Sequence, residues 1–188
     1  DAVTSSNIAT ESVPKPEKNP GAVPVELYVM SQCPYGVEAL KAIKPAIDKL
    51  GADVDVALEY IGQEDGSGNL TSMHGPAEVK GNIAQLCALQ HAPAKAFDLI
   101  ACQNENMRQV DTNWETCASK IGVPVQPLKA CIEGAEGKKL LSASFKRAEK
   151  KGATGSPTIY IGGKPYEGRR SPDAFLRAIC SAHPESRK

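Results

Sequence analysis

The feature that most constrains the fold is the order in which the hydrophobic period changes along the chain. From Val23 apolar and polar residues alternate, which predicts a strand. After Cys33 the apolar residues recur every three or four positions, which predicts a helix, and alternation returns over 54–61. Two strands joined through a helix of this length form a right-handed parallel crossover. The sequence therefore opens with a β-α-β unit.

After residue 61 the hydrophobic period of the sequence changes twice more. Residues 76–152 carry four or five helical segments punctuated by proline and glycine, one of them expected to begin at Pro93. Sheet character resumes at 158–161, and two glycines then form a hairpin turn. A last helix begins at Ser171, an N-cap followed by proline. The predicted fold class is α/β, a β-α-β and β-β-α core interrupted by an all-helical insertion.

These changes of period also predict the domain organisation. Residues 1–22 hold three prolines and no periodic apolar face, so we expect a flexible tether. The core is predicted to comprise 23–75 and 153–183, with the helical insertion over 76–152 and a short tail over 184–188. The chain begins at an aspartate, without a charged n-region or an apolar h-region, which suits a protein whose signal peptide has been removed.

Composition excludes several classes of partner. The chain has 22 basic and 22 acidic residues, so it lacks the basic surface that binding to nucleic acid requires. No apolar run approaches the roughly 18 residues of a membrane span. Six cysteines in 188 residues favour an oxidising compartment. We therefore expect an extracytoplasmic protein, whether periplasmic, secreted or lumenal.

Cys33 is the first candidate for chemistry. It lies between the predicted first strand and the first turn of the following helix, with Pro34 at the first helical position. The unpaired N–H groups and the dipole of a helix start stabilise an anion, so a thiol there becomes a thiolate more easily. The alternative is a buried structural thiol. An exposed, reactive cysteine is the favoured interpretation because such helix tips are usually exposed.

The other cysteines favour structural roles. Four of them lie on apolar helix faces within the insertion and are predicted to form two disulfides: Cys87, Cys102, Cys117 and Cys131. Six cysteines allow about 15 complete pairings, and the sequence does not choose among them. In an antiparallel bundle the nested option joins Cys102 to Cys117 and Cys87 to Cys131. Cys180 then remains, either free and buried or linked to one of the four.

A family resemblance rests on several segments together. They are the opening VELYVMSQCPYG, the dipeptide His74-Gly75, the cysteine ladder GNIAQLCALQ, DLIACQNE, NWETCASKIG and LKACIEG, then GKKLLSASFKRA, SPTIYIGGKPYEG and the terminal LRAIC. With these the chain resembles the thioredoxin superfamily with a helical insertion, as in DsbA-like proteins, and most closely the gamma-interferon-inducible lysosomal thiol reductase family. The resemblance implies a thioredoxin-like core. It also implies that Cys33 attacks disulfides and that Pro157 is a cis-proline whose loop, with Ser156 and Thr158, binds the substrate backbone.

The chain departs from the family's pattern at the redox motif. The family has Cys-x-x-Cys, whereas here the motif reads Cys33, Pro34, Tyr35, Gly36, so a second cysteine is missing. The family's His-Gly signature is also flanked by cysteines that this chain lacks. A single sulfur can attack a disulfide but needs an outside thiol to be released.

We therefore expect a thiol-disulfide oxidoreductase-like protein that acts by mixed-disulfide exchange, of the reductase or isomerase type. Its partners would be a protein client bearing a disulfide or thiol, or a low-molecular-weight thiol, and no cofactor is expected. Tyr35 would shape the groove.

Two alternatives stay open. One is a non-catalytic thioredoxin-like module that holds a client. The other is a Cu(I)-binding protein, since soft ligands suited to that ion could gather from four residues: Met30, Cys33, Met73 and His74. No Cys-x-x-Cys or His-x-x-x-His ligand pair is present, so a metal site is not expected.

Overall fold

The fold comes from a computed structural model that describes residues 17–184. Residues 1–16 of the expected tether and 185–188 of the expected tail lie outside the described residues. Residues 17–22 are attached to the core, because Lys18 forms an ion pair with Asp55 and the backbone N–H of Asn19 donates to the Ala52 carbonyl at 3.0 Å. The attached part of the chain therefore begins before the expected strand.

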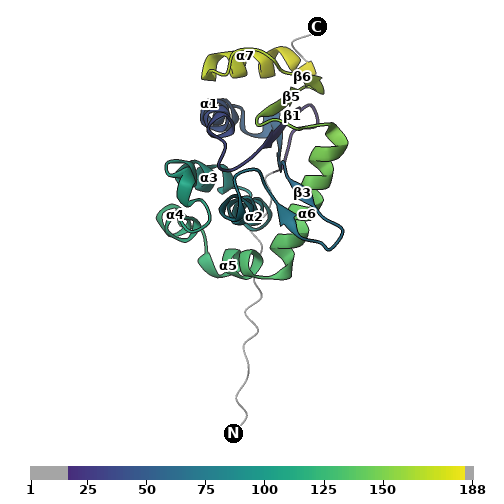
Figure 1. Ribbon diagram of the computed structural model, residues 1–188. Helices are drawn as coiled ribbons and strands as arrows, with labels where there is room; N and C mark the ends of the chain where they lie inside the picture. Colours follow the sequence, from purple (N-terminus) through teal and green to yellow (C-terminus); the bar gives the residue numbers. More distant parts are fainter. Residues whose placement is uncertain (1–16, 185–188) are drawn as a thin grey trace.

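A four-stranded mixed sheet lies at the centre of the molecule (Figure 1). Its strands, in the order β2-β1-β5-β6, are β1 (Val23–Val29), β2 (Val54–Tyr60), β5 (Thr158–Ile161) and β6 (Lys164–Pro165). β1 pairs in parallel with β2 and antiparallel with β5, and β5 pairs antiparallel with β6. The parallel crossover and the C-terminal hairpin expected from the sequence are both present.

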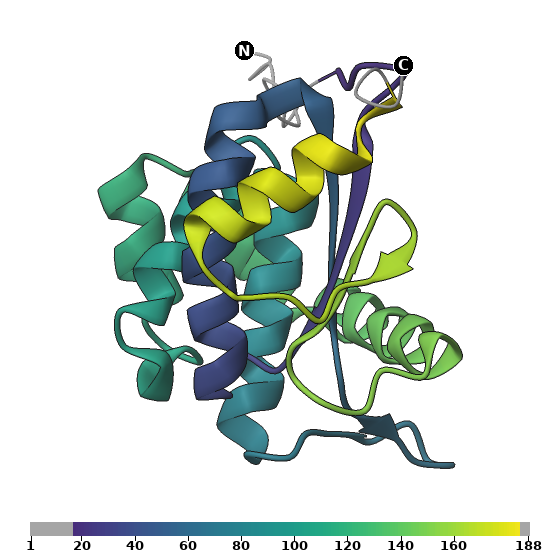
Figure 2. The same ribbon diagram turned by 90° about the horizontal axis from the view of Figure 1, so that it is seen from above.

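Seven α-helices and two 3₁₀ turns are found in residues 17–184. They are α1 (Pro34–Leu50), η1 (Gly51–Asp53), α2 (Pro76–His91), α3 (Ala96–Asn104), η2 (Met107–Gln109), α4 (Trp114–Ile121), α5 (Val125–Glu133), α6 (Ala135–Lys151) and α7 (Pro172–Ala182). Helices α1 and α7 lie together on one side of the sheet and α6 lies on the other (Figure 2). This places the start of α1 and the loop after α6 at the same end of the central strands.

The alternation in β1 decides which side chains enter the core. Val23, Val25 and Leu27 are at most 2 % exposed, whereas Pro24 and Glu26, between them, are exposed and half-buried. At the end of the strand Tyr28 and Val29 are both buried, because α6 covers the second face there. β1 is therefore a central strand with helices on both faces.

Helix α2 is buried along most of its length, so it has no polar face of its own. Every residue from 81 to 88 is buried, since α3, α5 and α6 surround the helix (Figure 1). Side chains of α2 to α6 and of the sheet form one continuous apolar core. Among residues 17–184 no helix is long and apolar enough to cross a membrane.

The two expected disulfides staple the helical region. Cys87 of α2 is bonded to Cys131 of α5, and Cys102 of α3 to Cys117 of α4, which is the nested pairing. Cys180 differs from expectation: it belongs to neither bond and is exposed on α7 rather than buried.

Two local features differ from the sequence-based expectation. The turn-rich stretch 62–75 contains a two-stranded hairpin, β3 (Gln63–Glu64) paired with β4 (Leu70–Thr71), which is too short and too polar to give a period. Helix α3 begins at Ala96 rather than at Pro93, because a tight turn precedes it in which the Lys95 N–H donates to the Ala92 carbonyl at 3.0 Å.

The N-cap of α7 gives a first testable prediction. The Ser171 hydroxyl accepts a hydrogen bond from the Ala174 N–H at 3.3 Å, with Pro172 at the first helical position. Replacing such a cap by alanine costs about 1 kcal/mol. We expect Ser171→Ala to lower the free energy of unfolding in urea by that amount. The control Ser119→Ala removes an exposed hydroxyl from α4 and should leave stability unchanged or slightly higher.

Candidate active site around Cys33

Cys33 is the N-cap of α1, as the sequence indicates. Its backbone is extended (φ −86°, ψ 117°), and Pro34 opens the helix behind it. The residue is only 8 % exposed, so the expectation of an exposed sulfur is wrong. Cys33 is buried because it packs in a small apolar cluster with side chains from β1, from α6 and from the loop after α6. This cluster contains Tyr28, Met30, Cys33, Ile61, Ala148 and Ala153.

The loop after α6 meets Cys33 directly. The Ser156–Pro157 peptide bond is cis, and the Cys33 thiol donates a hydrogen bond from Sγ to the Ser156 carbonyl at 3.6 Å. Pairing of β1 with β5 sets Tyr28 opposite Thr158, which brings this loop to the start of α1. The Ser156 hydroxyl in turn accepts the Met30 N–H at 3.0 Å. Four of the residues singled out from the sequence therefore meet: Cys33, Ser156, Pro157 and Thr158.

Gly36 fills the position where a second cysteine would stand. A Cβ at Gly36 would clash with the Ser156 hydroxyl oxygen and would lie 3.3 Å from the Cβ of Val29. The backbone of Gly36 is helical and would accept any L-residue, so the obstacle is the neighbouring side chain rather than backbone strain. The missing side chain at Gly36 thus leaves the space that the Ser156 hydroxyl occupies.

Two residues that sequence reasoning missed hold the loop before Cys33. The Ser31 N–H donates to Asn82 Oδ1 at 3.1 Å, and the Gln32 N–H donates to Glu78 Oε2 at 2.8 Å. Both acceptors lie on α2, and both are fully buried. The available signal was spacing: Glu78 and Asn82 are four residues apart, which places both on one side of a helix, and His74 precedes Glu78 by the same interval.

A groove of about 1030 Å³ begins beside this cluster. It runs between α6 and the β3–β4 hairpin, and Met30, Ile61 and Ala153 line both the groove and the Cys33 cluster. Tyr35 and Met73, which are 69 % and 74 % exposed, are the large apolar side chains that residues 17–184 expose most. Another groove of about 630 Å³ follows β2 and contains none of the predicted site residues.

Tyr28 is the other ionisable member of the Cys33 cluster. Burial, followed by its hydrogen bond to Glu26 at 2.8 Å, raises the pKa of Tyr28 well above the ordinary value. The phenol is therefore neutral and brings no charge to the sulfur.

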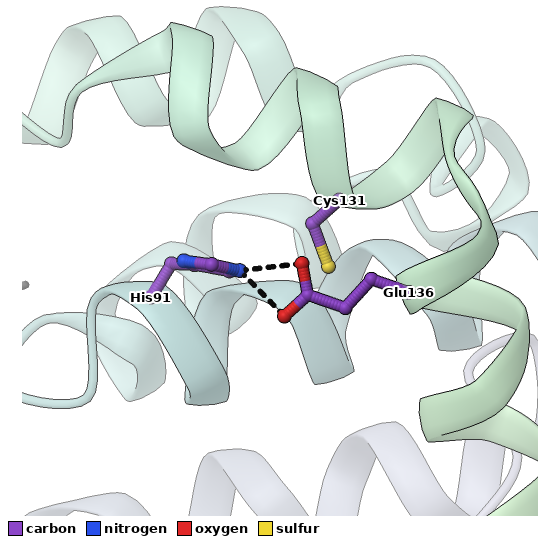
Figure 3. A group of neighbouring side chains, drawn as sticks. All are labelled: His91, Cys131 and Glu136. Carbon is purple, nitrogen blue, oxygen red and sulfur yellow. Dashed lines mark hydrogen bonds and ion pairs between the residues drawn. The ribbon is translucent and has the colours of Figure 1, made fainter. Parts of the chain in front are cut away.

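The residues considered for copper differ in burial and in their contacts. Met30 and Cys33 share a cluster, but His74 Nδ1 lies 2.7 Å from the Glu78 carboxylate and Met73 is largely exposed. The cluster of possible ligands found within 17–184 is elsewhere, at His91, Cys131 and Glu136 (Figure 3). The sulfur of Cys131 is bonded to Cys87, so it is not a thiolate ligand. The set around Cys131 therefore does not favour a metal centre.

Comparison with known proteins shows what the chain is similar to. It is 26% identical to the gamma-interferon-inducible lysosomal thiol reductase of Carassius auratus, over 88% of this chain and 70% of the relative. It is also 22% identical, over 90% of its own length, to the Na(+)/H(+) antiporter NhaA 3 of Salinispora tropica, but it spans only a quarter of that protein.

A solved structure is similar over most of the chain. BdbD from Bacillus subtilis matches with a TM-score of 0.67 and 17% identity, over 88% of this chain and 90% of that one. At this identity the match shows the fold alone, a thioredoxin-like core with helical additions. The family described as gamma interferon inducible lysosomal thiol reductase (GILT) matches residues 24–121, more than half of the sequence. The chain therefore belongs to the gamma interferon inducible lysosomal thiol reductase family.

Proposed function

We propose that this protein is a thiol-disulfide oxidoreductase that works through one sulfur, that of Cys33. The single observation that carries the proposal is the contact of Cys33 Sγ with the Ser156 carbonyl at the start of α1. It sets a thiol at a helix N-terminus against a loop with backbone groups for a substrate. Family membership supports the same chemistry.

The exchange at Cys33 has two steps, and in each step one S–S bond forms as another breaks. The Cys33 thiolate attacks one sulfur of a substrate disulfide, so a Cys33–substrate S–S bond forms and the substrate S–S bond breaks. The leaving sulfur departs as a thiolate and takes up the proton that Cys33 lost. A low-molecular-weight thiol then attacks the mixed disulfide, which regenerates Cys33 and leaves that thiol bonded to the substrate sulfur. A second equivalent of the thiol completes net reduction.

The residues around Cys33 have separate roles in this proposal. Ser156, Pro157 and Thr158 bind the substrate backbone, and the exposed ring of Tyr35, two residues after the attacking cysteine, shapes the groove. The substrate is a disulfide of a protein or of a small molecule. Two disulfides in the helical region support an oxidising, extracytoplasmic compartment.

Trapping of the mixed disulfide tests the proposal. Incubation with glutathione disulfide is expected to add one glutathione to Cys33, found by peptide mass mapping, and reduced glutathione should remove it. Cys33→Ser should reduce glutathione-dependent turnover of a small disulfide to the uncatalysed background. The control Cys180→Ser removes the exposed cysteine outside both disulfides and should retain turnover. Turnover that survives Cys33→Ser would refute the assignment.

A second candidate function is a client-binding module without turnover. The observation that favours it is the low exposure of Cys33 together with two exposed apolar side chains, Tyr35 two residues further along the chain and Met73 on the groove that Met30 also lines. This candidate requires peptide binding that is unchanged in Cys33→Ser together with no labelling of Cys33 by glutathione disulfide. The trapping experiment therefore separates the two functions.

A further inference from the structure

Glu78 is a buried ionisable group that the exchange steps do not use. It lies in the first turn of α2 and has no exposed surface. Removing a carboxylate from water is costly unless hydrogen bonds and an opposite charge compensate for it. The contacts that compensate for this burial indicate what the residue does.

Those contacts join two loops. Glu78 Oε2 accepts the Gln32 N–H at 2.8 Å and lies 2.7 Å from His74 Nδ1. Glu78 Oε1 accepts the Ser72 hydroxyl at 2.5 Å and the His74 N–H at 3.2 Å. One carboxylate therefore ties the loop before α2 to the loop before Cys33.

The same side of α2 makes two further contacts with the residue before Gln32. The Ser31 hydroxyl donates to the Glu78 carbonyl at 3.2 Å, and the Ser31 N–H donates to Asn82. Gly81 permits this approach, since a Cβ there would lie 2.9 Å from the Ser31 hydroxyl oxygen. Helix α2 thus fixes two consecutive N–H groups immediately before the reactive cysteine.

We infer that Glu78 is a positioning residue for Cys33 and that the His74–Glu78 pair sets the charge that acts on its sulfur. The inference rests on the proposed function only in taking Cys33 as the reacting atom. His74 is 35 % exposed in its side chain and Glu78 is 0 % exposed, so the pair extends from solvent to the Gln32 N–H. A nearby carboxylate disfavours a thiolate and a nearby imidazolium favours it.

Within residues 17–184, few groups contact the Glu78 carboxylate and the Cys33 sulfur. The Glu78 carboxylate is met by the His74 ring, the Ser72 hydroxyl and the Gln32 N–H. The Cys33 sulfur is met by the Ser156 carbonyl, and the phenol of Tyr28 in the same cluster is neutral. The His74–Glu78 pair is therefore the pair of titratable side chains that is joined to the Cys33 loop by a hydrogen bond.

The test is the rate of Cys33 alkylation by iodoacetamide as a function of pH, in a Cys180→Ser background so that Cys33 is the thiol outside both disulfides. Glu78→Gln removes the negative charge and should move the midpoint of the profile down by about half a pH unit. His74→Gln removes the imidazole that pairs with the Glu78 carboxylate, so the negative charge loses this partner and the midpoint should move up by a similar amount. Opposite shifts are the signature of the pair.

A matched control changes a second histidine–glutamate pair, which within residues 17–184 makes no hydrogen bond to the Cys33 loop. His91 at the end of α2 pairs with Glu136 of α6, Nε2 to Oε1, at 2.9 Å (Figure 3). Glu136→Gln should leave the profile of Cys33 unchanged.

Midpoints equal to the parent's in both variants, or shifts of the same sign, would overturn the inference and leave Glu78 a merely structural residue. If Glu78→Gln does not fold, His74→Gln decides alone, because the partly exposed ring tolerates replacement. Alkylation needs no disulfide substrate, so loss of exchange activity would refute the proposed function without affecting this test.

Discussion

The double variant Gly36→Cys/Ser156→Ala is expected to form an internal disulfide between Cys33 and the introduced cysteine, and to reduce insulin with dithiothreitol faster than the parent by a factor on the order of 10 to 100. An internal thiol resolves the mixed disulfide at a much higher effective concentration than an external one. The backbone of Gly36 is already helical, so the main obstacle to the new side chain is the Ser156 hydroxyl, which is the group closest to its Cβ. Insulin precipitation gives the rate, and mass mapping of the quenched protein gives the disulfide.

The single variants show which contact matters. Gly36→Cys alone should gain less, because its Cβ forces the Ser156 hydroxyl to rotate away from the Met30 N–H. Ser156→Ala alone removes that hydrogen bond and adds no thiol, so it should gain nothing. Equal activity of Gly36→Cys and the double variant would contradict the role assigned to Ser156. No gain in either would contradict the geometry of exchange at Cys33.

The parts of the fold that could be predicted from sequence are those with a clear period. Alternation over β1 identified the central strand, and the change to helical spacing after Cys33 identified the helix that carries the sulfur. Two glycines marked the turn of the C-terminal hairpin, and proline marked the start of α7. These signals are local. In each case the residues of one helix, strand or turn are enough to identify it, without its contacts to the rest of the chain.

The parts that could not be predicted depend on contacts between distant segments. Burial of Cys33 requires α6 and the loop after it, which lie more than 100 residues away along the chain. Glu78 and Asn82 enter the site because α2 is enclosed by other helices, so its polar residues are buried instead of facing water. Cys180 is different: Phe175 and Ile179 define the buried face of α7, and the next residue is rotated by about 100° from it, so its exposure was predictable.

The disulfide between α2 and α5 is expected to stabilise the protein more than the disulfide between α3 and α4. Cys87 and Cys131 close a loop of 44 residues in the unfolded chain, and Cys102 and Cys117 one of 15. The loss of chain entropy then corresponds to about 4 and about 3 kcal/mol, respectively. The sulfurs of the longer loop also belong to the core, because Cys87 and Cys131 are at most 1 % exposed. We therefore expect Cys87→Ala/Cys131→Ala to lower the free energy of unfolding in urea by at least about 4 kcal/mol, and Cys102→Ala/Cys117→Ala by about 3. The reverse order would contradict the loop argument and indicate that the α3–α4 pair holds the helical region together.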